Sequence, residues 1–337
     1  MTFEEYCKLH SDKIYKKLCE YIPDKEPKEH YKMVREYTQR RGKYARPNLV
    51  LLWCELYRGK VEDAFLSACG IQMVEDWVLI HDDWEDQNEL RRGKPAAHIL
   101  YGDVFAVNAG DAGHMIQWRI VRDASKTPRI GERLYEKFYD IMLVIAEGQY
   151  CDLKLAREKD ITRFTLEDYW RSIHAKSAYY SVYGPMQLGA IAAGQTDAVV
   201  GRIEEYGVPI GRAFQIKDDI LDCTSTSEIL GKSIGTDIYE GTKTAILWHF
   251  VQNAPSTELE AVKAIYAKDR KDKTQEEVAR VIKLFEKTRS IKFAQDLVDS
   301  IAKEALEKFE EQTRDIPESD IKKTARDAIV RMAARKR

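Results

Sequence analysis

Two groups of acidic residues have a type and spacing that suit cation binding. Each has the pattern DDxxD next to apolar residues, at Asp82, Asp83 and Asp86 and again at Asp218, Asp219 and Asp222. Within each group the first and last aspartates are four residues apart, so on a helix they share one face. Carboxylates this close repel one another, and such hard oxygen ligands favour Mg²⁺, which completes its shell with water and substrate phosphate. If the two faces are directed at each other, the sequence predicts a six-carboxylate cleft that binds Mg²⁺ and a diphosphate.

Apolar periodicity predicts the helices that position these aspartates. Before the first group an apolar residue recurs every three or four positions, at Val61, Phe65, Cys69, Met73, Trp77 and Ile80. A second series runs through the other group, at Ile203, Ile210, Phe214 and Leu221. The first aspartates should therefore lie near the end of a long buried helix. No run alternates apolar and polar residues as a strand does, so the sequence predicts an all-α fold.

Composition narrows the class of protein. The 337 residues are 44% hydrophobic and 33% charged, enough for one large all-helical domain or two smaller ones. The net charge of -2 gives no overall basic field for nucleic acid. We expect a single domain over 1–337, with the motifs at about 40–245 and charged amphipathic helices over about 256–337.

Three further features bear on compartment and chemistry. The amino terminus lacks a secretory signal, which favours a cytoplasmic protein. Six scattered cysteines without a CxxC pair indicate reduced thiols rather than a zinc site or a disulfide framework. The uncharged stretch 177–195 contains Gly184-Pro185, Gln187 and three tyrosines, so we interpret it as a buried, kinked core helix and not as a transmembrane segment.

With these motifs the sequence resembles the trans-isoprenyl diphosphate synthases of the polyprenyl synthetase family. RGKYARP at 41–47 is similar to the family's GGKxxRP, and HDDWEDQNELRRGKP at 81–95 to its first aspartate-rich motif. AFQIKDDILD at 213–222 with GKSIGTDIYEG at 231–241 is similar to the second. AEGQYCDL at 146–153 and HAKSA at 174–178 also have counterparts, so the likeness covers residues 40 to 245.

The resemblance implies an isoprenoid synthase fold, with antiparallel helices around a central substrate cavity, that works as a homodimer with two or three Mg²⁺ ions per site. It also implies the reaction: an allylic diphosphate ionises, isopentenyl diphosphate attacks the carbocation, and a proton is lost. Asp82, Asp86 and Asp218 would hold the metal, with Asp83, Asp219 and Asp222 as further or outer ligands. The allylic diphosphate would contact Arg91, Lys176, Gln215 and Lys232, two of which, Lys176 and Lys232, are also catalytic candidates.

The second diphosphate, that of isopentenyl diphosphate, is implied to bind Lys43, Arg46 and Arg92. Here the chain departs from the family. Glu75 stands where the family has His or Gln, and its carboxylate would repel the diphosphate unless it were protonated or turned onto a neighbour such as Arg46. Tyr44 and Thr242 replace basic residues, although Lys243 follows at once.

These departures motivate an alternative activity. A terpene synthase shares the fold and the metal-driven ionisation but needs no second diphosphate. Retention of Lys43, Arg46 and Arg92 favours the chain-elongating enzyme, and two undecayed DDxxD patterns disfavour a non-catalytic subunit.

Product length depends, in the family, on bulk just before the first aspartates. Trp77 occupies the floor position, about 7.5 Å from Asp82 along a helix at about 1.5 Å per residue. At about 100° per residue the smaller Val78 and Val74 lie more nearly in line with Asp82, which leaves a path past the indole. We therefore predict geranylgeranyl diphosphate as the product, with farnesyl diphosphate next.

Overall fold

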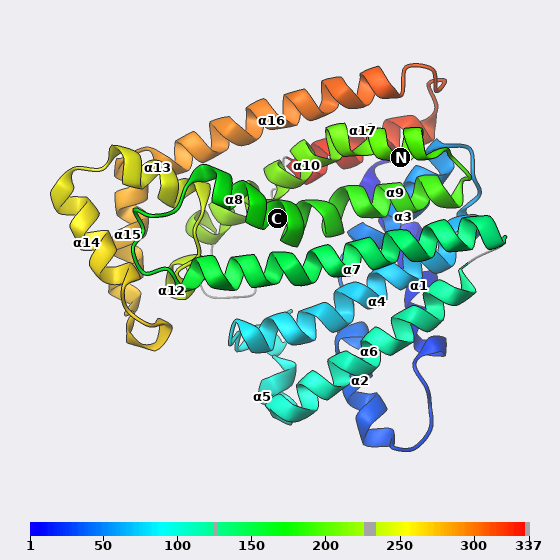
Figure 1. Cartoon of the computed structure of the whole chain (residues 1–337), viewed down its shortest axis with the longest axis horizontal. Helices are drawn as coiled ribbons and strands as arrows, with labels where there is room; N and C mark the ends of the chain where they lie inside the picture. The colour runs from blue at the N-terminus through cyan, green and yellow to red at the C-terminus, as the bar shows by residue number, and fades with distance from the viewer. Residues whose placement is uncertain (125–126, 226–233, 334–337) are drawn as a thin grey trace. The chain divides into compact units, whose positions relative to one another are not determined.

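The computed structural model describes residues 1–124, 127–225 and 234–333 of the chain, and it is all-α as predicted. Figure 1 shows the course of the helices. Their bounds are α1 Phe3–Tyr21, α2 Lys28–Arg40, α3 Ala45–Leu56, α4 Val61–Glu85, α5 Ala97–Tyr101, α6 Asp103–Asp123, α7 Pro128–Arg157, α8 Leu166–Ile173, the π-helix η1 His174–Tyr183, α9 Gly184–Ala192, α10 Asp197–Thr224, α12 Thr236–Glu240, α13 Ala245–Asn253, α14 Ser256–Tyr266, the 3-10 turn η2 Arg270–Asp272, α15 Gln275–Lys287, α16 Ser290–Gln312 and α17 Asp320–Ala333.

The two helices predicted to position the aspartates are both present. The first is α4, of 25 residues, and the first aspartate group lies at its carboxyl end. The second is α10, of 28 residues, and the second group lies in its last two turns.

A short β-hairpin with a two-residue turn follows α4. Its strands, β1 Leu90–Arg91 and β2 Lys94–Pro95, are the β-structure of the described part of the chain. Arg92 and Gly93 at the turn have φ of 54° and 73°, the positive values that a type I′ turn requires at both central residues. The strands are too short for alternation to reveal them in the sequence. The turn separates Arg91 from Arg92 and sends their side chains to different partners.

The chain divides into two compact units. The first comprises Met1–Ile141, Ser181–Glu204 and Gln312–Ala328. Its centre is formed by α3, α4, α6 and α9, and Figure 1 shows α4 and α6 lying against each other. Glycine permits the closest approach: a Cβ on Gly189 of α9 would lie 2.3 Å from the Val50 carbonyl oxygen of α3. A Cβ on Gly113 of α6 would lie 2.8 Å from the Trp77 Cβ of α4.

The second unit comprises Met142–Tyr180, Glu205–Glu311 and Ile329–Arg337, of which the structure describes 142–180, 205–225, 234–311 and 329–333. Its core joins α8, the end of α10, the apolar helix α13 and the charged helices α14 to α16 through residues such as Ile216, Phe250 and Phe285. Gly211 of α10 passes so close to η1 that a Cβ there would lie 2.2 Å from the Ala178 Cβ.

Other sequence predictions concern the cysteines and the apolar stretch. All six cysteines are free, and Cys7, Cys54, Cys69 and Cys223 are buried. Residues 177–192 are buried, in η1 and α9, which meet at Gly184. No helix in the described ranges is both long and apolar enough to cross a membrane. The basic carboxyl end lies outside those ranges from residue 334 onward.

Candidate functional site

The first aspartate group divides into two half-buried carboxylates and one buried carboxylate. Asp82 and Asp86 are partly exposed, and the Asp86 amide donates to the Asp82 carbonyl oxygen at 2.9 Å as α4 ends. Asp83 is fully buried. The i, i+4 pair therefore shares a face, as the spacing predicted, while the middle aspartate points into the first unit.

The Asp83 carboxylate accepts hydrogen bonds from several side chains. Tyr37 of α2 donates its hydroxyl at 2.6 Å, and Arg91 donates through Nε at 3.0 and 2.9 Å to the two carboxylate oxygens, as well as through Nη2. Asn88 adds a contact at 3.3 Å. These donors offset the cost of burying the charge. Because Arg91 Nη2 also lies 3.6 Å from Asp82 Oδ2, Asp83 holds this guanidinium beside the half-exposed carboxylate.

Two of the cationic residues predicted for the second diphosphate, Arg46 and Arg92, pair with Glu75 of α4. Arg46 Nη1 is 3.1 Å from Glu75 Oε2, and Arg92 Nη2 is 3.2 Å from Glu75 Oε1. The carboxylate thus bridges two arginines, one of which the sequence had suggested as its partner. Lys43 is exposed. Glu75 itself is buried, so the ion pairs are shielded from water on most sides.

The second aspartate group has one half-buried carboxylate and two buried ones. Asp218 is half-buried, whereas Asp219 and Asp222 are buried. Tyr169 of α8 donates its hydroxyl to Asp219 Oδ2 at 2.7 Å, and Gln215 Nε2 donates to Oδ1 at 3.0 Å. Burial raises the pKa of Asp219 to about 7, opposed by those two hydrogen bonds and reinforced by the neighbouring carboxylates Asp218 and Asp222.

Asp222 anchors the segment that follows α10. Its Oδ2 accepts the amide of Asp237 at 3.1 Å, and its carbonyl oxygen accepts the amide of Gly235 at 2.9 Å. Asp222 therefore fixes the start of α12, which carries the end of the second motif.

Of the other residues predicted to bind the allylic diphosphate, Gln215 has defined side-chain contacts. Gln215 accepts the Ser177 hydroxyl at 2.5 Å while donating to Asp219, so its amide is oriented by both neighbours. The backbone of Lys176 lies in η1, between the helix α8 and Ser177. Lys232 lies outside the described residues.

The two replaced basic positions have local explanations. Tyr44 is buried with φ of 55° and precedes α3, so its side chain packs into the core. Thr242 donates its amide to the Asp237 carbonyl oxygen at 2.8 Å. Lys243 is buried and donates to the Gly241 carbonyl oxygen at 2.8 Å, and burial lowers its pKa to about 8. Lys243 is thus turned into the second unit.

The predicted floor residues differ in their surroundings. Val74 is buried, whereas Trp77 and Val78 are half-buried. The Trp77 indole donates to Gln117 Oε1 at 3.2 Å and its ring centroid lies 4.8 Å from that of His114. Both partners are on α6, so this helix holds the indole in place.

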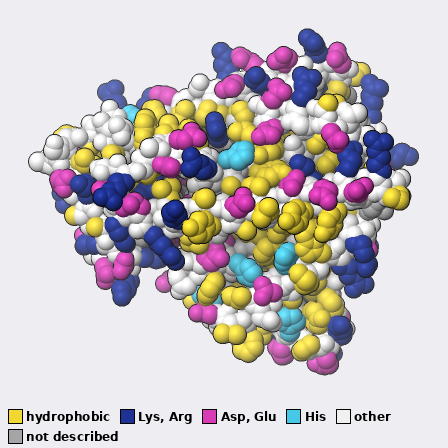
Figure 2. All heavy atoms as spheres, in the orientation of Figure 1, with side chains coloured by type: hydrophobic (Ala, Val, Ile, Leu, Met, Phe, Trp, Pro, Cys, Tyr) yellow, Lys and Arg dark blue, Asp and Glu magenta, His cyan; other side chains and the backbone are white. Residues whose placement is uncertain are grey.

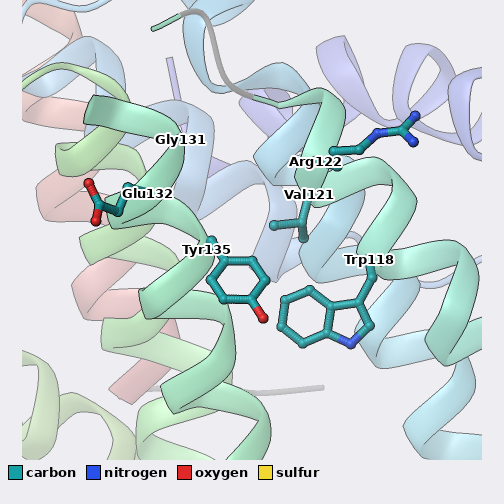
Figure 3. A pocket seen from close by; sticks show the side chains of 6 residues that line it. All are labelled: Trp118, Val121, Arg122, Gly131, Glu132 and Tyr135. Atoms are coloured by element: carbon teal, nitrogen blue, oxygen red, sulfur yellow. The ribbon is translucent and has the colours of Figure 1, made fainter. Parts of the chain in front are cut away.

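A pocket of about 600 Å³ lies further along the same aromatic series, between α6 and α7. Its lining consists of Trp118, Val121, Arg122, Gly131, Glu132 and Tyr135. Figure 3 shows the Trp118 and Tyr135 rings side by side, and their centroids are 5.1 Å apart. Trp118 donates its indole N–H to His114 Nε2 at 3.0 Å, which links this pocket to the surroundings of Trp77. None of the predicted site residues lines it.

The donor set suits hard divalent cations. Asp82, Asp86 and Asp218 offer half-buried carboxylate oxygens, the ligand type that Mg²⁺ prefers. Within residues 1–124, 127–225 and 234–333, no three acidic, histidine or cysteine side chains form a ready-made metal cage. A metal at either group would therefore draw its remaining ligands from water or phosphate. The convergence of the two groups stays a prediction, because they belong to different compact units.

Two side chains that contact the aspartates could not be found from the sequence. Tyr37 and Tyr169 each donate to the middle aspartate of one group. Neither tyrosine lies in a motif, and they are 46 and 50 residues from their partners. No motif in the sequence pairs either tyrosine with its aspartate.

Comparison with known proteins gives a consistent result. Residues 27–285 match the model of the family described as polyprenyl synthetase. The chain is 34% identical to the short chain isoprenyl diphosphate synthase of Methanothermobacter thermautotrophicus, over 80% of this chain and 81% of that protein. It is 28% identical to the geranylgeranyl diphosphate synthase of Methanosarcina mazei, over 95% of each. The crystal structure of geranylgeranyl pyrophosphate synthetase from Pyrococcus horikoshii superposes with a TM-score of 0.86 at 30% identity, covering 99% of both chains.

Proposed function

Because this chain belongs to the polyprenyl synthetase family, and is therefore a prenyltransferase with the all-α isoprenoid synthase fold, we propose that it condenses isopentenyl diphosphate with an allylic diphosphate. It is a short-chain prenyl diphosphate synthase, and geranylgeranyl diphosphate is the proposed main product, with farnesyl diphosphate next. The names of the relatives and the Trp77 position support this length.

The allylic half of the reaction uses the aspartates and Arg91. Members of the family use divalent metal ions, and we propose Mg²⁺, two or three ions per site, held by Asp82, Asp86 and Asp218, to compensate the charge of the leaving diphosphate. Arg91 lies beside Asp82, where its guanidinium can donate to the same phosphate oxygens. Since the diphosphate gains negative charge as it departs, these interactions strengthen in the transition state.

The buried aspartates act on their neighbours. Asp83 orients Arg91, and Asp219 is oriented by Tyr169 and Gln215. We assign both to the outer layer of the site, together with Asp222. Lys176, Gln215 and Lys232 are proposed as further donors to the allylic diphosphate.

The observation that carries the elongating reaction is the second cationic site. Arg46 and Arg92 converge within 3.2 Å of one carboxylate, so two guanidinium groups already share a single anionic partner. Together with Lys43 they compensate the charge of a second diphosphate. A terpene synthase needs no such site.

Assembly is part of the proposal. Large apolar side chains are exposed along α6 and the first half of α7, at Val104, Phe105, Met115, Tyr135 and Tyr139. Figure 2 shows hydrophobic side chains gathered over these two helices. A contiguous apolar surface of this kind is typical of a protein interface, and we propose that it is buried in a homodimer.

The test of the activity is a product assay. The protein is incubated with Mg²⁺ and geranyl or farnesyl diphosphate, with and without isopentenyl diphosphate, and the products are identified by mass. A longer diphosphate that forms only with isopentenyl diphosphate supports the elongating synthase and gives its chain length. A hydrocarbon or alcohol formed regardless of isopentenyl diphosphate would make the chain a terpene synthase.

A further inference from the structure

Glu75 pairs with both arginines of the proposed second cationic site. Its two carboxylate oxygens are divided between two guanidinium groups, with Oε2 at 3.1 Å from Arg46 Nη1 and Oε1 at 3.2 Å from Arg92 Nη2. The three side chains come from α3, α4 and the hairpin turn, so the arrangement joins separate elements. Ten per cent of the Glu75 side chain is exposed, against 23% and 20% for Arg46 and Arg92. The acid thus lies beneath two more accessible cations.

The surroundings leave the carboxylate close to these arginines. Gly42 lies over the pair, since a Cβ there would be 2.7 Å from Arg92 Nη2 and 3.6 Å from Glu75 Oε1. On the other side Asp76 is buried and accepts hydrogen bonds from Thr38 at 2.7 Å and Gln72 at 3.0 Å. Asp76 is thus held by its own donors, and the Glu75 carboxylate is the one that pairs with Arg46 and Arg92.

We propose that Glu75 is a built-in counter-anion which must release Arg46 and Arg92 before the diphosphate of isopentenyl diphosphate can bind. This inference rests on the proposed function, and it makes Glu75 a positioning residue that lowers affinity for the second substrate. The exchange replaces one carboxylate charge by the larger charge of a diphosphate, so binding remains favourable. The displaced carboxylate stays near the bound diphosphate and repels it.

The exchange also favours the more highly charged ligand. A group with two phosphates offers both arginines a fork of oxygens, whereas a single phosphate competes less well with the resident carboxylate. Glu75 should therefore increase discrimination between diphosphate and monophosphate forms of the same five-carbon substrate.

The decisive experiment is calorimetric titration of the full-length chain with isopentenyl diphosphate, in chelator and without allylic substrate, so that the aspartates bind no metal. Glu75→Gln keeps the size and polarity of the side chain but removes its charge. We expect the variant to bind isopentenyl diphosphate about tenfold more tightly than the parent, because a repelling charge next to the ligand is gone. Glu75→Asp retains the charge and should stay close to the parent. Equal or weaker binding by Glu75→Gln, or equal gains by both variants, would overturn the proposal.

Two controls separate charge from folding and from the proposed activity. Glu62→Gln removes one exposed charge from the same helix and should not alter this affinity. If Glu75→Gln is too unstable to titrate, inorganic diphosphate should raise its melting temperature more than that of the parent, and an equal rise would contradict the exchange. If the parent fails to elongate an allylic diphosphate, the proposed function is wrong, yet tighter diphosphate binding by Glu75→Gln still supports the exchange. Elongation by the parent with no change in affinity overturns the exchange alone.

Discussion

The middle aspartate of each acidic group is more deeply buried than the aspartate before it. Asp83 and Asp219 are buried and accept a tyrosine hydroxyl at 2.6 and 2.7 Å, whereas Asp82 and Asp218 are half-buried. Burial thus separates identical residue types within one motif into half-buried carboxylates, which we propose as metal ligands, and buried carboxylates, which accept hydrogen bonds from neighbouring side chains.

The tyrosine donors can be tested by removing one oxygen atom. Tyr37→Phe and Tyr169→Phe each leave a buried carboxylate with one donor fewer, so we expect a loss of about 1–3 kcal/mol in the free energy of unfolding. Turnover should also fall, by about tenfold, because the aspartates lose orientation. Urea denaturation and product formation measure the two effects. Tyr150→Phe, at a side chain that is 66% exposed, serves as the control, and losses no larger than its own would contradict the assignment.

Asp82 and Asp218 are expected to dominate turnover. Asp82→Ala or Asp218→Ala removes a carboxylate proposed to hold the Mg²⁺ that compensates the charge of the leaving diphosphate. Turnover should drop by several orders of magnitude, at least about a hundredfold. Release of diphosphate under saturating Mg²⁺ measures it. A decrease below about tenfold would refute the metal role.

The buried carboxyl of Asp76 should make the free energy of unfolding depend on pH. Burial, and to a lesser extent the charge of Glu75, raises the pKa of Asp76 to about 7. Hydrogen bonds from Thr38 and Gln72 and the charge of Arg92 act in the opposite direction and lower it. Tyr44, from the segment before α3, is a further titratable neighbour. The unfolded chain loses this proton near pH 4 but the folded chain only near pH 7, so the free energy of unfolding should fall as the pH rises through about 4 to 7.

Chemical denaturation of the parent and of Asp76→Asn across that range checks this. The variant should show a shallower decline and a relative gain above pH 7. Parallel curves for the two proteins would show that Asp76 titrates normally.

At the level of helices, α4 combines three parts of the site. It carries Trp77 and Val78, then Asp82 and Asp83, and Glu75 lies seven residues before Asp82, close to the same face of the helix. Its position depends on α6, since Gly113 allows the Trp77 Cβ to approach and His114 packs against the indole at 4.8 Å. The proposed floor of the product cavity therefore depends on two helices, although the sequence indicated only one.

Product length tests this pairing. Trp77→Ala removes the indole that α6 holds, and the product should become longer, with a shift toward chains above C20. Gly113→Ala should act in the opposite direction, since its Cβ would lie 2.8 Å from the Trp77 Cβ and push the indole away from α6. Leu79→Ala truncates an apolar side chain that packs with Tyr37 and Ile80, and leaves length unchanged. Mass analysis of the products decides, and an unaltered distribution in Trp77→Ala would refute the floor assignment.

For the molecule as a whole, the main surface feature is the exposed apolar surface of α6 and α7. The net charge of -2 gives no indication of it. Phe105 and Met115 are 59% and 60% exposed, which is costly for side chains of this size in water. A homodimer that buries them stays a prediction.

Sedimentation velocity checks the dimer. The parent should sediment as a dimer, and the double variant Phe105→Glu with Met115→Glu as a monomer, because like charges would face each other across the contact. Leu9→Glu serves as the control, because it places a charge at a residue of α1 that is 56% exposed. This variant should remain a dimer. Identical sedimentation of all three proteins would exclude this surface.

What could be predicted from the sequence depended on local regularities. Apolar periodicity located α4 and α10, and the DDxxD spacing placed Asp82 and Asp86 on one face. The departure at Glu75 suggested a pairing with Arg46, which the structure confirms. The hairpin that presents Arg92 as the second partner was too short to be detected.

Local pattern by itself determined the helices and the residue types available for binding phosphate and cations, because periodicity and spacing act within a few turns of one element. Burial was decided only by the tertiary structure. Asp83 and Asp219 are enclosed, Tyr37 and Tyr169 reach them from other helices, and Lys243 turns inward to the Gly241 carbonyl oxygen. Such contacts join residues far apart in the chain, and the energy of a buried charge depends on every group around it, which no single stretch of sequence contains.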